Sequence, residues 1–191
     1  DKDKLLHQVN QIRENPNIEL GIHPNFNFLL NGDFRYGKTY ESVIEYYLKI
    51  VPDAVSVRSH SLVQSSNILN FFDVKNIKYD LNLYIPRDSN ISLKPISTWL
   101  PNLIRLPHFW EDDFHFSNNN PNNNIHYYTN FEGLKIFDFH PIHVFLNIEN
   151  ISRYKSAKPF LKDFEKLNSL RNINTFGCET FLKNLINEFS N

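Results

Sequence analysis

Apolar residues recur at helical spacing in five stretches of the chain. In the first, Leu5, Val9 and Ile12 fall on one face of a helix over residues 2–13, because positions three or four apart share a face. The same spacing predicts further helices over residues 40–50, 64–72, 160–167 and 179–189. Each of these stretches is therefore expected to cover a core on one side only.

Short apolar runs lie between the expected helices. They predict strands over residues 18–22, 54–57, 77–79 and 134–139, and an extended segment over residues 83–86. Helices that alternate with short apolar strands are typical of an α/β protein with a mainly parallel sheet or barrel.

Composition narrows the class of protein. Lys and Arg number 20 against 21 Asp and Glu, which argues against a general nucleic-acid partner. No apolar run is long enough to span a membrane. The single cysteine, Cys178, excludes an internal disulfide, and we expect it to be chemically inert. The sequence starts at Asp1 and contains no methionine, so we expect it to be part of a longer protein.

Three of the expected strands end in a histidine: His23, His60 and His140. In α/β folds the carboxyl ends of the strands carry the chemistry. His23 is followed at once by Pro24, and a rigidly held neutral imidazole suits a metal ligand. A structural histidine at the end of a strand is the alternative. The convergence of three such histidines favours a functional site.

Charged groups accompany these histidines. Arg58 precedes His60 and could orient a catalytic carboxylate or form a simple salt bridge. Residues 107–115 place three carboxylates between aromatic rings, which indicates either a sugar site or a solvated acidic loop. His143 follows His140 closely, and the two could supply a general acid or a ligand. The chain lacks a phosphate-binding glycine loop and a nucleophile elbow.

Four segments taken in order, residues 19–27, 57–62, 109–113 and 139–143, resemble the polysaccharide deacetylase superfamily with the NodB-type fold, and in particular its WbmS-like branch. The resemblance implies a distorted (β/α) barrel forming one catalytic domain over residues 1–191. It also implies a divalent metal, commonly zinc, bound by one Asp and two His, with a second Asp as general base and a late His as general acid.

Carried onto this sequence, the resemblance makes His23 the first metal ligand. Asn27 stands where the second His is usual, and we expect His60 to replace it. Arg58 would orient the base, and His140 would be the acid, with His143 as the alternative. The paired Asp of the family, together with the first strand, is expected upstream of residue 1.

We therefore expect a metal-dependent carbohydrate deacetylase that removes an N-acetyl group from a sugar or glycan of a bacterial surface polysaccharide, such as lipopolysaccharide or capsule, and acts in the cytoplasm. The expected sugar contacts are Trp110, Phe109, Asp112 and Asn25, with Asp113 as a further ligand or base. One alternative is a non-catalytic glycan-binding protein on the same fold. Another is a glycosidase using Glu111 and Asp113, although residues two apart on a strand are too close to straddle a sugar.

Overall fold

The structure is a computed structural model of the chain. It describes residues 2–190, with the backbone alone described for residues 2–6. The chain divides into two compact units. Unit 1 comprises Asp1–Ile85 and Lys94–Pro107, and unit 2 comprises Pro86–Leu93 and His108–Asn191. The expectation of a single catalytic domain over residues 1–191 stays a prediction.

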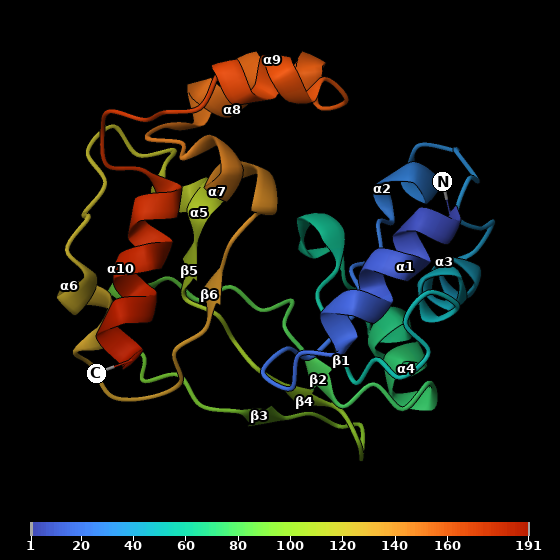
Figure 1. Cartoon of the computed structure of the whole chain (residues 1–191). Helices are drawn as coiled ribbons and strands as arrows, with labels where there is room; N and C mark the ends of the chain where they lie inside the picture. Colours follow the sequence, from blue (N-terminus) through green and yellow to red (C-terminus); the bar gives the residue numbers. More distant parts are fainter. Residues whose placement is uncertain (1, 191) are drawn as a thin grey trace. The chain divides into compact units, whose positions relative to one another are not determined.

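The helices of unit 1 follow the sequence pattern closely (Figure 1). They are α1 (Lys2–Arg13), α2 (Asn27–Leu30), α3 (Tyr40–Leu48) and α4 (Ser66–Val74), with the 3₁₀ turn η1 (His60–Leu62). A capping box formed by Thr39 and Ser42 starts α3, and the Ser65 side chain caps α4. Such caps satisfy backbone N–H groups that a helix leaves without partners. The helices expected over residues 2–13, 40–50 and 64–72 are confirmed.

The sheet of unit 1 has four very short strands: β1 (Ser56–Val57), β2 (Tyr79–Asp80), β3 (Ile96–Ser97) and β4 (Ile104–Arg105). Their order is β1-β2-β4-β3, with β3 antiparallel to β4 and the other pairs parallel. The strand expected over residues 18–22 is reduced to one parallel bridge between Ile22 and Val57. Ile18 is 45% exposed, so the start of that apolar run lies outside the core.

One hydrophobic core supports these strands. Val43 and Ile44 of α3 pack with Phe72 of α4 against residues at or beside the strands, such as Ile22 and Val57. All five side chains are nearly inaccessible to solvent. The core thus fixes the places where the strands of unit 1 end.

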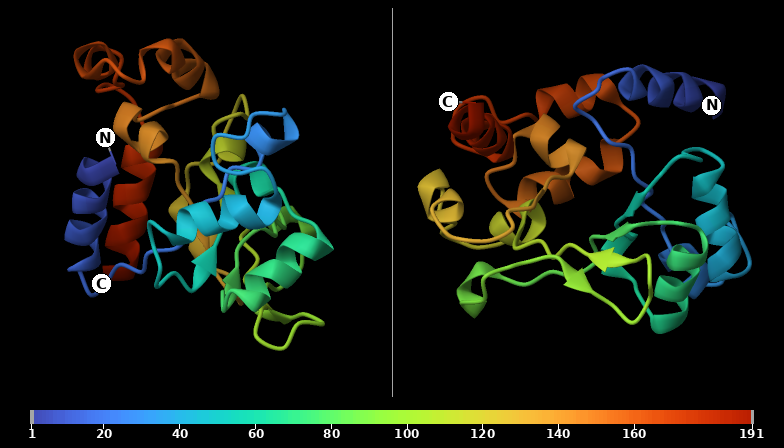
Figure 2. Two further views of the ribbon diagram at one scale, coloured as in Figure 1. Left: turned by 90° about the vertical axis from the view of Figure 1, so that its right-hand side faces the viewer. Right: turned by 90° about the horizontal axis from the view of Figure 1, so that it is seen from below.

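Unit 2 combines a two-stranded parallel sheet with short helices. Strands β5 (Trp110–Glu111) and β6 (Phe137–Asp138) pair with Trp110 opposite Phe137. The helices are α5 (Asp112–His115), α6 (Ile125–Thr129), α7 (Pro141–Leu146), α8 (Ile151–Ala157), α9 (Phe164–Ser169) and α10 (Cys178–Ser190), with η2 (Arg87–Ser89) and η3 (Lys158–Phe160). The chain runs from α7 through α8, η3 and α9 to α10 (Figure 2).

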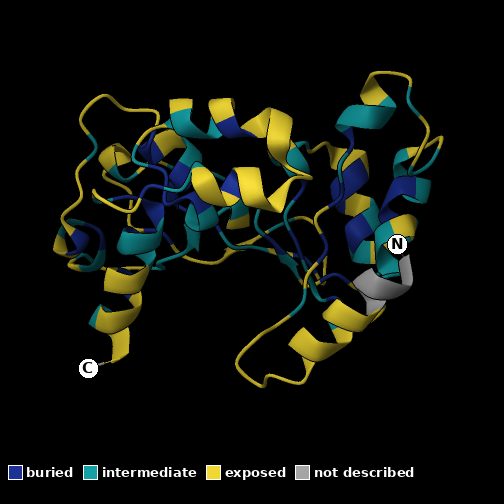
Figure 3. Cartoon of the chain, turned by 45° about the horizontal axis from the view of Figure 1, so that its top comes forward, coloured by how far each residue is buried: buried dark blue, intermediate teal, exposed yellow. Residues whose placement is uncertain are grey.

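Aromatic rings form the core of unit 2. Trp110 stacks on Phe181 of α10 with ring centroids 4.6 Å apart, and Phe109 packs edge-on against Phe137 at 5.0 Å. Burial follows these contacts, and the C-terminal part of α10 is largely exposed (Figure 3). The strand expected over residues 134–139 is confirmed only at 137–138, and the helix expected over residues 160–167 begins at Phe164, where Asp163 caps it.

The two sheets confirm an α/β protein with mainly parallel pairing. Neither sheet closes on itself among residues 2–190, so the barrel remains a prediction. None of the helices described here is long and apolar enough to cross a membrane.

Candidate active site

Two of the strand-end histidines lie side by side in unit 1. His23 Nε2 is 3.4 Å from His60 Nδ1, and the two rings meet edge to face at 83°. Two nitrogen ligands of one tetrahedral zinc ion, each about 2.0–2.1 Å from the metal, are separated by about 3.3–3.4 Å. The pair therefore has the spacing of two ligands on a single ion.

Backbone pairing brings the two imidazoles together. Ile22 N–H donates to Ser56 O at 3.0 Å, and Arg58 N–H donates to Ile22 O at 3.1 Å. Past this bridge, His60 N–H donates to Pro24 O at 2.9 Å. The segment ending at His23 and the segment ending at His60 thus run next to each other. Arg58, the expected partner of a catalytic base, lies half-buried in the second segment.

Both asparagines that the sequence singles out make hydrogen bonds within unit 1. Asn27, which stands where the family usually has a second metal His, donates from Nδ2 to Ser61 Oγ at 3.0 Å. Asn25, expected to contact the sugar, accepts the Asn27 N–H on its own Oδ1 at 3.0 Å. The structure thus shows both side chains in local hydrogen bonds within unit 1, and sugar binding by Asn25 stays a prediction.

A buried ion pair lies at the ends of the neighbouring strands of unit 1. Arg105 Nε donates to Asp80 Oδ2 at 2.7 Å, and the Asp80 side chain is fully buried. The parallel register of β2 and β4 places these residues opposite each other. Neither Asp80 nor Arg105 was among the site residues expected from the sequence. The available signal was a charged residue directly after each of two short strand-like segments, residues 77–79 and 103–104.

In unit 2, the carboxylate of Asp112 is bonded to His140. His140 Nδ1 lies 2.7 Å from Asp112 Oδ1, and the His140 backbone N–H donates to Oδ2, also at 2.7 Å. Asp112 follows β5 and His140 comes shortly after β6, so the parallel pairing of these strands brings them together. Asp112 is fully buried, which makes it a partner of the imidazole and not the sugar contact that we expected.

This contact changes the protonation of both groups. Hydrogen bonding to Asp112 raises the pKa of His140 to about 9, against the opposing effect of burial. Burial alone would raise the pKa of Asp112, but its hydrogen bonds to His140 and the nearby imidazole of His143 lower it to about 2. His140 is therefore an imidazolium at neutral pH.

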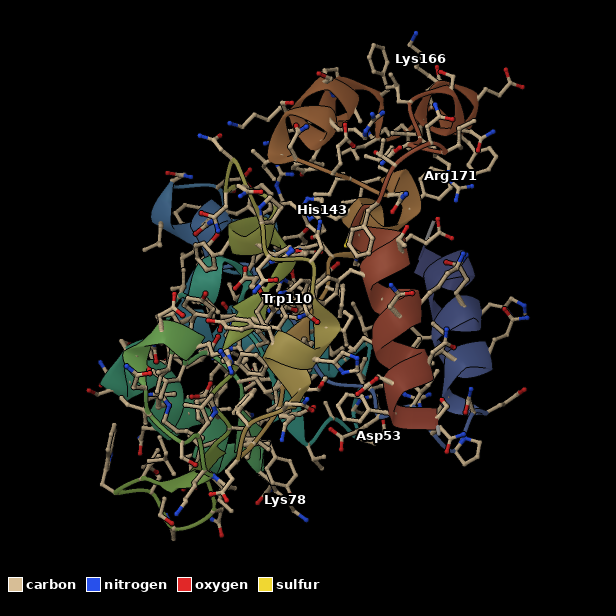
Figure 4. The ribbon with its side chains drawn as sticks, turned by 90° about the vertical axis from the view of Figure 1, so that its left-hand side faces the viewer. Asp53, Lys78, Trp110, His143, Lys166 and Arg171 are labelled. Carbon is tan, nitrogen blue, oxygen red and sulfur yellow. The ribbon has the colours of Figure 1, made fainter. Side chains whose placement is uncertain are left out.

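His143 and Asp113 complete the cluster. His143 is 2% exposed, and its Nδ1 lies 3.1 Å from Asp112 Oδ1 and 3.3 Å from Asp113 Oδ1, although neither contact has hydrogen-bond geometry. Burial raises the pKa of Asp113, whose side chain is 41% exposed. Figure 4 labels His143 within unit 2.

Two groups of side chains in unit 2 also have ligand atoms close enough to bind a cation. They are Asp112, Asp113, His140 and His143, and Glu111, Asp138 and His140. The 2.7 Å contact between His140 and Asp112, however, is a hydrogen-bond distance. It is shorter than the separation of about 3.3 Å that two ligands adopt on a tetrahedral ion.

Cys178 begins α10 and is fully buried. Its thiol donates to Asp112 Oδ2 at 3.5 Å, and burial raises its pKa far above the usual range. A thiol that does not ionise is a poor nucleophile, which supports the expectation that Cys178 is chemically inert.

The two aromatic residues expected to stack on a sugar do not offer a free face. Phe109 is 4% and Trp110 3% exposed, and Trp110 lies among other side chains of unit 2 (Figure 4). Aromatic spacing along the sequence cannot distinguish a ring in the core from one in a binding site. We therefore assign both rings to the core of unit 2.

Side chains at the carboxyl ends of parallel strands are the arrangement of an α/β enzyme. The WbmS-like polysaccharide deacetylase family matches residues 4–158. The crystal structure of WbmS from Bordetella bronchiseptica, provisionally assigned as a polysaccharide deacetylase involved in O-antigen biosynthesis, is 38% identical. It aligns with a TM-score of 0.81 over 94% of this chain and 74% of its own. A comparison with curated proteins finds no match. The chain belongs to the WbmS-like family of polysaccharide deacetylases.

Proposed function

We propose that this protein is a metal-dependent carbohydrate deacetylase that hydrolyses the amide of an N-acetyl sugar during surface polysaccharide biosynthesis. Family membership supports the reaction class. The observation that carries the proposal is the buried Asp112 carboxylate, which keeps His140 protonated at neutral pH. Amide hydrolysis needs such a group, because the amine leaves only when it receives a proton.

His140 is the general acid in this proposal. Its Nδ1–H is bonded to Asp112, so the proton at Nε2 is the one that can be transferred to the departing nitrogen. Asp112 keeps its negative charge and stabilises the imidazolium until transfer. The His140 side chain is 27% exposed, whereas that of His143 is 2% exposed. Exposure therefore favours His140 over His143 as the residue that meets a substrate.

His23 and His60 would bind the metal. Their nitrogen separation of 3.4 Å fits a tetrahedral ion, and imidazole suits zinc as well as cobalt or nickel. Such an ion, when bound, lowers the pKa of a coordinated water and polarises the amide carbonyl. The protein's own contribution is to bring the main chains of the two histidines next to each other, through the backbone pairing of their segments.

The test combines metal content with acetate release. We expect near-stoichiometric metal in the wild type by inductively coupled plasma mass spectrometry, and release of acetate from N-acetylated glycans. His23→Ala and His60→Ala should each lose both the bound metal and the release of acetate. The control is His126→Ala, whose exposed imidazole pairs with Glu188 in unit 2. If metal were lost in Asp113→Ala but kept in His23→Ala, the metal site would lie in unit 2. A folded wild type that takes up no zinc would contradict the proposal and favour a non-catalytic glycan-binding protein.

A further inference from the structure

The turn that carries His60 is fixed by a buried amide. Ser59 N–H donates to Asn82 Oδ1 at 2.6 Å, and both residues are almost completely inaccessible to solvent. His60 N–H donates to Pro24 O at 2.9 Å. Two consecutive backbone groups are thus bonded to other parts of unit 1. These bonds determine where the His60 side chain leaves the main chain.

Asp80 determines which way this amide points. The backbone N–H of Asn82 donates to Asp80 Oδ1 at 3.1 Å, and Asn82 Nδ2 donates to the same oxygen. An ionised carboxylate can only accept hydrogen bonds, so Nδ2 must face Asp80 and Oδ1 must face Ser59. If the Asn82 amide were rotated, its Oδ1 would face the Asp80 carboxylate and its Nδ2 would face the Ser59 N–H, and neither contact would be a hydrogen bond.

Arg105 in turn fixes Asp80. Its Nε donates to Asp80 Oδ2 at 2.7 Å, and its terminal nitrogen bonds to Gln64 Oε1. A buried carboxylate needs such a partner, because an unpaired charge in the interior is very unfavourable. The bonds therefore run without interruption from Arg105 through Asp80 and Asn82 to the backbone beside His60.

The backbone after His60 gives an independent reason to connect this network with function. Ser61 and Leu62 both adopt positive φ, 56° and 53°. Side-chain-bearing residues rarely take this conformation, and they keep it only where surrounding structure enforces it. Strain of this kind concentrates at functional sites. A merely connecting turn would not need two such residues in succession.

We infer that Asp80 and Asn82 are positioning residues for His60. They hold its imidazole at ligand distance from His23 and thereby set the affinity of the metal site. This inference rests on the proposed function, in which His23 and His60 bind the metal. Neither Asp80 nor Asn82 contacts the metal in this proposal, and their effect reaches it only through the turn.

The first test uses Co²⁺ alone as the probe, titrated into the whole chain and followed by its visible absorption. Asn82→Ala should bind Co²⁺ about 10- to 100-fold more weakly, the usual effect of removing a group that orients a ligand, and its spectrum should change. The matched control is Asn172→Ala, which removes another buried amide, one that bonds to Asn147 and Thr175 in unit 2. The control should bind Co²⁺ as the wild type does.

A second measurement needs no metal. The ring centroids of His23 and His60 are 5.5 Å apart, so ring protons of the two residues should show a nuclear Overhauser contact in the wild type and in Asn172→Ala. Asn82→Ala should lose it while its circular dichroism stays native. Should Asn82→Ala fail to fold, Asp80→Asn, which frees the amide to rotate, should show the same loss.

The outcomes separate the two proposals. A folded Asn82→Ala or Asp80→Asn that keeps both the ring contact and the Co²⁺ affinity overturns the positioning role. A wild type that shows the ring contact but binds no Co²⁺ overturns the metal site alone. In that case, loss of the contact in Asn82→Ala still supports the positioning of His60 by the network.

Discussion

The two units place the same side chain, histidine, next to different groups. In unit 1, His23 and His60 place nitrogen next to nitrogen at 3.4 Å. In unit 2, His140 places nitrogen next to a carboxylate oxygen at 2.7 Å. The first spacing suits two lone pairs directed at one cation, and the second is a charge-assisted hydrogen bond. The group that faces each imidazole therefore determines whether it is suited to bind a metal or to donate a proton.

The units also differ in how the histidines are held. The His60 turn depends on two residues with positive φ and on the buried amide of Asn82. His140 directly precedes α7, whose first residue is Pro141, a residue whose fixed φ suits the start of a helix. One imidazole is thus held by a strained turn, and the other by an unstrained helix start.

The largest effect that tests this comparison is expected from His140→Ala. Loss of a general acid lowers kcat by about 100- to 10,000-fold, and acetate release should fall by that factor while metal content stays that of the wild type. The control is again His126→Ala, whose imidazole also lies next to a carboxylate, at 3.1 Å, but on the surface. If His140→Ala lost metal together with activity, the separation of roles between the units would be wrong.

Asp112→Asn tests the origin of the raised His140 pKa. The wild-type rate should fall only above about pH 9, because the acid must be protonated. In the variant the pKa of His140 should move back toward its ordinary value of about 6.5, so the rate should already fall above neutral pH. Asp113→Asn, which keeps the contact between Asp112 and His140, should shift the pH at which the rate falls far less. If the rate of Asp112→Asn still fell only near pH 9, Asp112 would not be the cause of the raised His140 pKa.

The same variant has a defined effect on stability. The pKa of His140 is raised in the folded state, so the stabilisation is fully present below about pH 6.5 and is lost as pH rises through about 9. The size is roughly 3 kcal/mol. Urea unfolding at pH 6 and pH 10 should show the wild-type advantage over Asp112→Asn at pH 6 and a much smaller advantage at pH 10. An advantage independent of pH would rule out this linkage.

The sequence predicts helices better than strands here, for a physical reason. A helix such as α3 repeats its apolar face over nine residues, and Thr39 marks its start. The strands are only two residues long, too short for alternation to be visible. The run over residues 18–22 is apolar like a strand, yet Ile22 alone pairs with a neighbouring segment.

The sequence predicted which candidate site residues lie at strand ends, but not which of their side chains are in contact. Strand ends indicated His23, His60 and His140, and the structure shows the first two in contact. The sequence could not show which of Glu111, Asp112 and Asp113 contacts His140. The pairing of β5 with β6 determines which carboxylate lies next to that imidazole. Asp80 was missed for the same reason: its partner, Arg105, lies far along the chain.

The smallest expected effect comes from Ser61→Gly. Glycine adopts positive φ without steric cost, which should recover about 1–2 kcal/mol of strain. Its greater freedom in the unfolded chain costs about 0.5–1 kcal/mol, and the bond from Asn27 is lost. The free energy of unfolding should therefore rise by at most about 1 kcal/mol in urea titrations.

The control for this change is Asn76→Gly, at φ 60° in the same unit. Asparagine tolerates positive φ better than serine does, so its replacement should gain less. Because the Ser59 and His60 backbone bonds remain in Ser61→Gly, Co²⁺ affinity should stay within a few-fold of the wild type. A clear loss of stability in Ser61→Gly, with no such loss in Asn76→Gly, would show that the turn after His60 is not strained. The two units would then differ only in the group that lies next to each imidazole.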